Sequence, residues 1–165
     1  MIRPAVPGDA AAIARIYARE VLEGTASFEI EAPDTAEMAA RLARVTGAGW
    51  PWLVDERDGR IAGYAYASQF RDRAAYRQTC ENSVYVDRDF QRQGVGRALL
   101  AALSDAAEAA GFHEMIAVIG DGSGNAASLA LHRAAGFEPA GLLKNVGLKF
   151  GRRLDVAYMQ KSLVP

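Results

Sequence analysis

The chain has 165 residues, of which half are hydrophobic and 24% are charged, and its formal net charge is −1. This length and balance predict one globular domain over residues 1–165, with enough apolar side chains for its own core. A total charge so close to zero gives no indication of a nucleic-acid partner or of an anionic membrane surface.

Cys80 is the only cysteine, so no intramolecular disulfide can form, which fits a reducing compartment. The first residues lack the apolar run of a signal peptide, and no stretch approaches the roughly 20 apolar residues that cross a bilayer. We therefore expect a cytoplasmic protein without a membrane partner.

The N-terminal part predicts a short strand at residues 1–5 and two helices. Asp9 is expected to cap the first helix. A loop at residues 24–33 follows, and Asp34 with Glu37 is typical of the start of a second helix. The side chains expected to face the core are Ile13, Ile16, Tyr17 and Val21 on the first helix, and Met38, Leu42 and Val45 on the second.

The middle of the chain predicts strands. Residues 52–54 and 61–67 are expected to pair as a hairpin around the turn at 56–59. Residues 70–76 are polar and irregular, and residues 81–87 predict a further strand.

The C-terminal part alternates helices and strands. A long helix is expected over residues 94–110, a strand at 115–119, a helix at 125–135, and two antiparallel strands within 137–163 around a turn at 149–152. The spacing predicts that the long helix buries Val95, Leu99, Leu103, Ala106 and Ala110. This order of elements predicts an α/β domain with a mixed sheet.

The segment at residues 91–100, QRQGVGRALL, lies between a predicted strand and the long helix. A helix start presents unpaired N–H groups and the positive end of the macrodipole, and Gly94 and Gly96 would let an anion approach them. Arg92 and Arg97 would add positive charge, so a pyrophosphate is the expected guest. A helix start that merely contains glycines remains the alternative.

Two common phosphate motifs do not fit this spacing. A Rossmann G-x-G-x-x-G motif would need glycine where Leu99 stands, and the G-x-x-x-x-G-K-[ST] pattern of a P-loop is absent. The pattern Gln91-x-x-Gly94-x-Gly96 instead resembles the acetyl-CoA pyrophosphate motif of the GNAT superfamily. A second family motif is matched by Asn125, Ser128, Leu131, Gly136 and Phe137.

This resemblance implies a GNAT-like mixed, mostly antiparallel twisted sheet of about six to seven strands flanked by about four helices. It also implies acetyl-CoA as co-substrate, no metal, and a strand whose backbone pairs with the pantetheine arm. The residues it assigns to acetyl-CoA are Val84, Tyr85, Val86, Gln91, Arg92, Gln93, Gly94, Val95, Gly96, Arg97, Asn125 and Ser128. Asn125 is equally suited to capping a helix.

Further segments resemble phosphinothricin and methionine sulfone/sulfoximine N-acetyltransferases over nearly the whole chain. They are 25–28, 52–54, 63–65, 71–76, 81–86, 132–137, 146–152 and 155–156. The resemblance implies transfer to the α-amino group of a small anionic or polar amino acid, and a homodimer. Relatives often carry an aromatic residue where this chain has Arg153, a departure expected to affect packing or the substrate entrance.

Acetyl transfer needs a neutral amine, so some group must take a proton from the ammonium form. Glu81 is the candidate base, acting directly or through water, because a carboxylate within a strand is unusual and the resemblance supports it. The alternative is a structural ion pair between Glu81 and Arg71 or Arg73. A backbone N–H at Val84 is expected to stabilise the oxyanion if a bulge splays the strand.

His132 takes the position that resembling proteins use to protonate the departing thiolate. The alternative is that His132 only packs.

Arg71 and Arg73 are candidates for binding a substrate carboxylate or phosphinate. The alternative is that they are solvated loop charges. Tyr76 and Phe28 are expected to line the substrate pocket or simply to pack. The complete substrate set that the resemblance implies is Phe28, Arg71, Arg73, Tyr76, Glu81 and Ser83. Lys149 and Arg152 are weaker candidates for anion contacts.

Covalent catalysis by Cys80 is disfavoured, because the sequence offers no base partner and strict strand alternation puts its side chain opposite Glu81. Two distant histidines without a Cys/His cluster give no metal-ligand spacing. The alternatives to a small-molecule enzyme are a protein, peptide or polyamine acetyltransferase and a non-catalytic acyl-CoA-binding module.

Overall fold

The computed structural model describes residues 1–164 and contains a seven-stranded sheet with the order β1-β2-β3-β4-β5-β7-β6. The strands are β1 (Ile2–Pro4), β2 (Trp52–Arg57), β3 (Arg60–Gln69), β4 (Thr79–Val86), β5 (Glu114–Gly120), β6 (Glu138–Lys149) and β7 (Arg152–Ser162). Within the described residues the four α-helices are α1 (Ala10–Glu23), α2 (Thr35–Gly47), α3 (Val95–Ala109) and α4 (Ala126–Ala134). The structure confirms the predicted α/β architecture.

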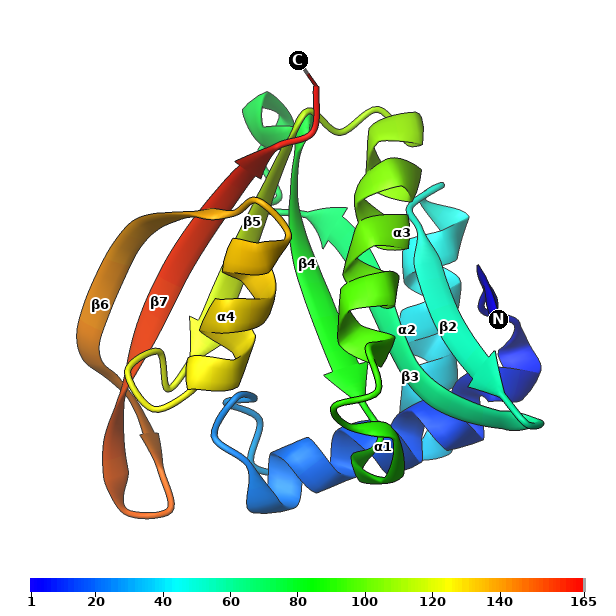
Figure 1. Cartoon of the computed structure of the whole chain (residues 1–165), viewed down its shortest axis with the longest axis horizontal. Coiled ribbons are helices and arrows are strands. Elements are labelled where there is room, and N and C mark those ends of the chain that lie inside the picture. Colours follow the sequence, from blue (N-terminus) through cyan, green and yellow to red (C-terminus); the bar gives the residue numbers. More distant parts are fainter. Residues whose placement is uncertain (165) are drawn as a thin grey trace.

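One parallel pair stands in an otherwise antiparallel sheet. Strands β4 and β5 pair in parallel from Thr79↔Glu114 to Asn82↔Ala117, and all other neighbours are antiparallel. Beyond Asn82 the two strands separate, although β4 continues to Val86 and β5 to Gly120. Figure 1 shows them diverging, with α4 in front of the gap.

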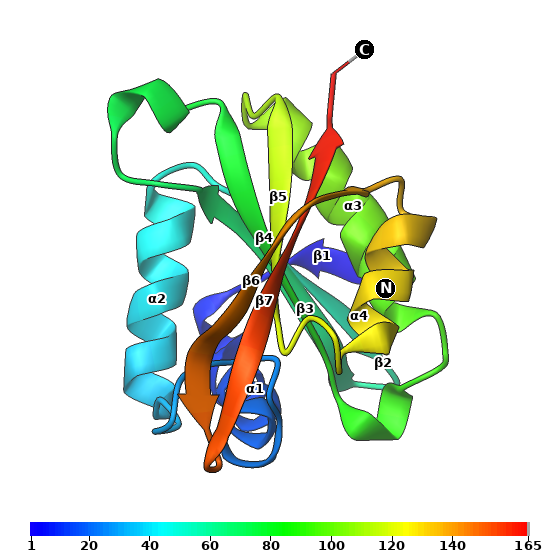
Figure 2. The same ribbon diagram turned by 90° about the vertical axis from the view of Figure 1, so that its left-hand side faces the viewer.

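The helices cover both faces of the sheet, α1 and α2 on one side and α3 and α4 on the other (Figure 2). The α3 face buries Leu99, Leu100 and Leu103 against Cys80 and Met115. The opposite face buries aromatic and aliphatic side chains of β2 and β3 against α1 and α2. Each face therefore has its own apolar core, and the β4–β5 gap opens between them.

Most expected elements are confirmed to within a few residues, with corrections at three places. Asp9 does not cap α1: its carboxylate accepts from the backbone N of Val6 at 2.8 Å and pairs with Arg3 at 2.8 Å, so it closes the preceding 3-10 turn. On α3, Ala107 is buried instead of Ala110, which is exposed. The irregular segment 70–76 contains a 3-10 turn at Ala74–Tyr76.

Asp34 accepts a hydrogen bond from the backbone N of Glu37 at 2.8 Å, which confirms the predicted cap of α2. Arg153 is exposed in β7 and lies opposite Leu148 of β6, so the departure from relatives falls on the outside of this hairpin. In residues 1–164 we find no helix of the length and hydropathy needed to cross a membrane.

Candidate active site

The start of α3 is built to leave its backbone amides open. Gly94 precedes the helix with φ +77°, a left-handed conformation that favours glycine. A Cβ on Gly96 would meet only side-chain atoms of Leu131 and Val86, at 3.4 and 3.5 Å. At Gly96, therefore, no side chain of α3 stands between the helix and its neighbours α4 and β4. The unpaired N–H groups of this first turn form the positive end of the helix dipole.

A cleft of about 550 Å³ runs from this helix start to the β4–β5 gap. It brings together nearly all of the residues predicted to bind acetyl-CoA, with Arg92 and Arg97 as its positive charges. Its lining includes Val84, Tyr85, Val86, Gln91, Arg92, Gly94, Val95, Gly96, Arg97, Asn125, Ser128 and His132. Gln93 does not line the cleft, because its side chain donates to the carbonyl of Asp89 at 3.0 Å on the outside.

The backbone of β4 presents free groups to the gap. At the two ends of this strand, Asp87 N donates to Ala62 O and Thr79 O accepts from Phe70 N, both at 2.9 Å and both on the β3 side. Since peptide groups alternate along a strand, those of Val84 and Val86 point the other way, into the gap where pairing with β5 has ended.

The expected bulge in β4 is absent over these residues, because the register with β3 runs without a shift from Gly63↔Val86 to Gln69↔Cys80. Divergence from β5 frees the Val84 amide instead. The Val84 amide therefore faces the gap without a bulge.

His132 lies on the same face as the cleft and is only 4% exposed. Its Nδ1 lies 2.8 Å from the carbonyl oxygen of Ser128, and its Nε2 lies 3.0 Å from Oδ1 of Asn82. The ring of Phe137 meets it edge-on, with centroids 5.0 Å apart. Burial lowers the pKa of His132 below its ordinary value, and the hydrogen bond to Ser128 opposes this effect.

Glu81 points to the opposite face of the sheet. Its neighbour Cys80 packs in the α3-side core, so alternation directs Glu81 toward the side of α1 and α2. It lies opposite Ser68 of β3 and Ile116 of β5, where burial raises the pKa of its carboxyl and the charge of Arg71 partly offsets the rise. In residues 1–164 Glu81 forms no salt bridge with Arg71 or Arg73, although the charge of Arg71 acts on its carboxyl.

A family model described as an acetyltransferase (GNAT) domain matches residues 2–158 of the chain. The chain belongs to the GNAT acetyltransferase family. This family membership, predicted from the pyrophosphate motif, is confirmed.

Individual relatives agree with it. The chain is 54% identical over 155 residues to a phosphinothricin N-acetyltransferase of Alcaligenes faecalis, covering 94% of this chain and 78% of the relative. It is 41% identical to an L-methionine sulfoximine/L-methionine sulfone acetyltransferase of Salmonella typhimurium, covering 98% and 94%. A crystal structure of a GNAT phosphinothricin acetyltransferase from Sinorhizobium meliloti in complex with AcCoA has a TM-score of 0.96 at 46% identity, covering 99% and 88%.

The remaining predicted substrate residues of this GNAT chain lie in two places. Arg71 stacks over the ring of Phe70 at 4.1 Å, and the ring of Tyr76 meets Phe70 edge-on at 5.8 Å. Gln69 fixes the same loop by donating to the carbonyl of Arg73 at 3.1 Å. The loop therefore has a defined shape near Glu81, and Arg71 and Arg73 keep exposed side chains.

Phe28 lies at the other end of the gap. Its ring packs against Gly120 and Gly147, where a Cβ on either glycine would clash with it. The carbonyl of Ala26 would lie 2.6 Å from a Cβ on Gly120, so the loop carrying Phe28 crosses directly over the end of β5. Ser83 borders a small cavity of about 60 Å³ in the gap, together with Asn82 and His132.

Several polar contacts around this site were not predicted from the sequence. No motif indicates the contact of Asn82 with His132. The same holds for the bidentate pair of Arg41 with Glu29, at 2.7 and 3.0 Å. Lys149, a weaker candidate for an anion contact, is buried and donates to the carbonyl of Ser27 at 2.7 Å. That bond holds the loop that carries Phe28, and Arg152 is exposed at the turn between β6 and β7.

A second cavity of about 610 Å³ lies on the face to which Glu81 points. Its wall includes Ser68, the residue directly opposite Glu81, and Tyr66, which lies opposite Ser83. The other lining residues are Glu29, Glu37, Arg41, Arg44, Val45, Trp50, Trp52, Gln69 and Asp72. This cavity therefore borders β3 beside Glu81, on the side of the sheet away from the cleft.

Cys80 is fully buried, and burial raises the pKa of its thiol to about 12. We expect Cys80→Ala to keep kcat within about two-fold, because a thiol that stays protonated is a poor nucleophile. Steady-state assays check this, and slow reaction of the native thiol with a disulfide reagent at neutral pH is the companion measurement. A loss of turnover with the fold intact would contradict it.

In residues 1–164 no cluster of His, Cys, Asp and Glu side chains suited to a metal is found.

Proposed function

We propose that this GNAT protein transfers the acetyl group of acetyl-CoA to the α-amino group of a small anionic or polar amino acid of the phosphinothricin or methionine sulfone/sulfoximine kind. One observation carries the proposal: the cleft and Glu81 lie on opposite faces of the sheet where β4 and β5 separate. A thioester held in the gap could then be reached by an amine from the Glu81 side. The named relatives act on such amino acids, which supports the substrate class.

Each step has a group suited to it. Acetyl-CoA supplies an activated acetyl thioester. Glu81, whose raised pKa makes it a better base than an exposed carboxylate, would take the proton that the attacking amine loses. The N–H of Val84 faces the gap and would donate to the developing oxyanion. His132 would supply the proton that the departing thiolate needs.

The open amides of α3, with Arg92 and Arg97, would hold the pyrophosphate. The backbone of β4 from Val84 to Val86 would pair with the pantetheine arm as a missing strand. Asn125 accepts from the backbone N of Ser128 at 3.3 Å and donates to Gly120 O at 3.4 Å, so it fixes the start of α4 against the end of β5. We propose that it shapes the cleft in this way.

The function is tested by measuring free-thiol release from acetyl-CoA. The acceptors are methionine sulfone, methionine sulfoximine, phosphinothricin, a polyamine and a peptide with a free N-terminus. Saturable turnover with at least one of the three amino acids, and little with the last two, is the expected result. Preference for the peptide or the polyamine would assign a different acceptor class. Silence on the whole panel with retained acetyl-CoA binding would favour a binding module.

Arg71→Ala and Arg73→Ala are each expected to raise the acceptor KM about ten-fold, because a guanidinium–carboxylate contact is strong and bidentate. The Kd of acetyl-CoA should change little, since neither side chain lines the cleft. Steady-state kinetics and calorimetry separate the two effects. Arg133→Ala, on the exposed side of α4, is the matched control. Weakened cofactor binding with an unchanged acceptor KM would reassign both residues.

We further propose that the protein is a cytoplasmic homodimer. Strand β6 is an edge strand of the sheet and carries a row of exposed apolar side chains, which supports an interface between two copies. They are Leu142, Leu143, Val146 and Leu148, with Phe150 in the turn that follows. Sedimentation at micromolar concentration should give a dimer, and a monomer alone would count against this proposal.

A further inference from the structure

Asn82 occupies the point at which the sheet divides. It is the last residue of β4 that pairs with β5, and its side chain is 6% exposed. By alternation it points to the same face as Val84 and Val86, toward α4 and the cleft. A polar side chain at this depth must find partners, because an unpaired buried amide is costly.

Two contacts occupy the Asn82 amide. Its Nδ2 donates to the carbonyl of Ile116 on β5 at 3.3 Å, and its Oδ1 lies 3.0 Å from Nε2 of His132. A carbonyl oxygen can only accept, so Ile116 fixes which end of the amide faces β5. The acceptor end of Asn82 is therefore always turned to His132.

The other nitrogen of His132 also faces an acceptor. Its Nδ1 lies 2.8 Å from Ser128 O, and the hydroxyl of Ser128 is 3.4 Å from the same nitrogen. A neutral imidazole carries one N–H and can satisfy only one of two acceptors, whereas the imidazolium carries two and satisfies both. The hydrogen bonds around His132 therefore favour its protonated form, while burial opposes it.

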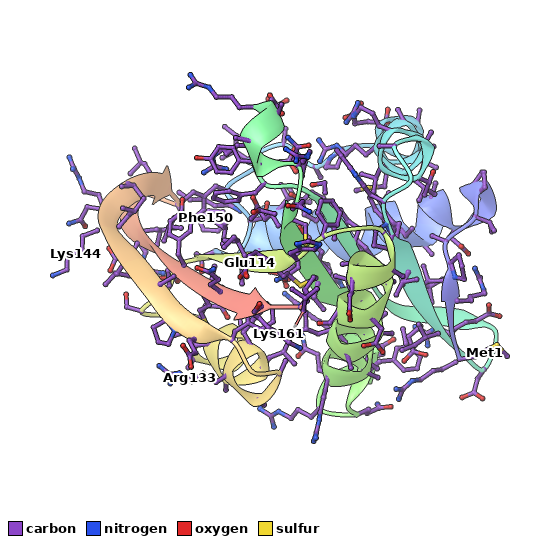
Figure 3. The ribbon with its side chains drawn as sticks, turned by 90° about the horizontal axis from the view of Figure 1, so that it is seen from above. Met1, Glu114, Arg133, Lys144, Phe150 and Lys161 are labelled. Atoms are coloured by element: carbon purple, nitrogen blue, oxygen red, sulfur yellow. The ribbon has the colours of Figure 1, made fainter. Side chains whose placement is uncertain are left out.

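No charged side chain contributes to this balance within the described residues. The groups that face His132 are Asn82 from β4, Ser128 from α4 and Phe137 before β6. Arg133, the next residue along α4, is exposed and extends away from the body of the molecule (Figure 3). Lys161 of β7 reaches instead toward Ser104 of α3, at 3.5 Å. Among residues 1–164, Asn82 is thus the one side chain from outside α4 that hydrogen-bonds to the ring.

We propose that Asn82 is a positioning residue that orients His132 and stabilises its protonated form, the form that supplies the proton for the departing thiolate; this rests on the proposed acetyl transfer. As the carbon–sulfur bond breaks, its electron pair stays on sulfur. The Nδ1 proton passes to Ser128 Oγ while the hydroxyl proton of Ser128 passes to sulfur. His132 is then neutral and keeps its proton on Nε2, where it is hydrogen-bonded to Asn82 Oδ1. Nδ1 takes up a new proton from solvent before the next cycle.

The test compares Asn82→Leu with Asn82→Asp. The ring nitrogens of His132 are titrated by NMR without substrates, with exposed His113 as internal reference. Leucine removes the acceptor, so the pKa of His132 should fall by about one unit, and aspartate should raise it by a similar amount. An acid must be protonated to act, so the alkaline fall of kcat should move to lower pH in the first variant and to higher pH in the second.

At neutral pH kcat of Asn82→Leu should be at least about ten-fold lower, with the Kd of acetyl-CoA within about two-fold of the parent. An unchanged His132 titration in both variants would overturn the proposal, even if kcat fell. Unchanged kcat in His132→Gln would also overturn it, because the proton would then come from elsewhere. If the parent protein acetylates no amine, the proposed function fails, while the titration still decides whether Asn82 controls His132.

Discussion

Glu81→Gln should lower kcat about 100- to 1,000-fold, which is the usual contribution of a well-placed general base. Glutamine keeps the size of the side chain and its place opposite Ser68, but it cannot take a proton. The Kd of acetyl-CoA should stay within about two-fold, because Glu81 lies on the other face of the sheet from the cleft. Calorimetry measures the Kd of acetyl-CoA, and single-turnover assays with the best acceptor measure the rate of acetyl transfer.

The pH dependence gives this prediction a second test. A base must be ionised, so kcat of the parent should rise with pH through a Glu81 pKa that lies above its ordinary value. In Glu81→Gln this acid limb should disappear. Glu108→Gln, an exposed change on α3, is the matched control and should leave both the rate and the profile unchanged. If the acid limb survives the loss of Glu81, another group is the base.

Gly96→Glu is expected to weaken acetyl-CoA binding at least about 100-fold, because a carboxylate beside a pyrophosphate places like charges together. A side chain at this position would extend between Leu131 and Val86, into the space in front of the open amides. The helix itself should form normally, since Gly96 lies in the first turn of α3 without a positive φ. Titration calorimetry measures the affinity, and circular dichroism verifies the fold.

Two companion variants separate charge from bulk. Gly96→Gln has the size of glutamate without its charge, and Gly96→Ala adds a methyl group whose nearest contacts are 3.4 Å away. Affinity should decrease in the order alanine, glutamine, glutamate, and the gap between the last two should shrink as salt is added. Equal affinity for all three would mean that the anion does not bind at this helix start.

The sequence was sufficient where the physical determinants are local. The periodic apolar residues of α3, the Asp34 cap and the glycines at the start of α3 each act within one or two turns of chain, so their pattern can be recognised directly in the sequence. The prediction for Asp9 was wrong because it considered local chemistry alone. Asp9 has the chemistry of a helix cap, but Arg3 and the amide of Val6 compete for its carboxylate.

The site was predictable only in part. Gln91, Gly94 and Gly96 form a motif because a phosphate needs them in one short stretch. Asn82 and His132 are 50 residues apart, and their contact exists only because α4 packs over the β4–β5 gap. Lys149 reaches Ser27 across an even longer separation, so no local pattern could indicate this contact. The one sequence signal that could have indicated Asn82 is a polar residue that alternates with Cys80 and Val84 on an otherwise apolar strand face.

The gap between β4 and β5 also has a consequence for the lifetime of the protein. Residues 83–86 pair with β3 and residues 118–120 pair with β7, but the edges that these two segments turn toward each other across the gap are unpaired. A ligand that fills this space stabilises only the native state, by about 2.7 kcal/mol when its concentration is 100 times its Kd. The protein should therefore unfold and be degraded faster in cells that have little acetyl-CoA, so that its abundance follows the supply of its own substrate.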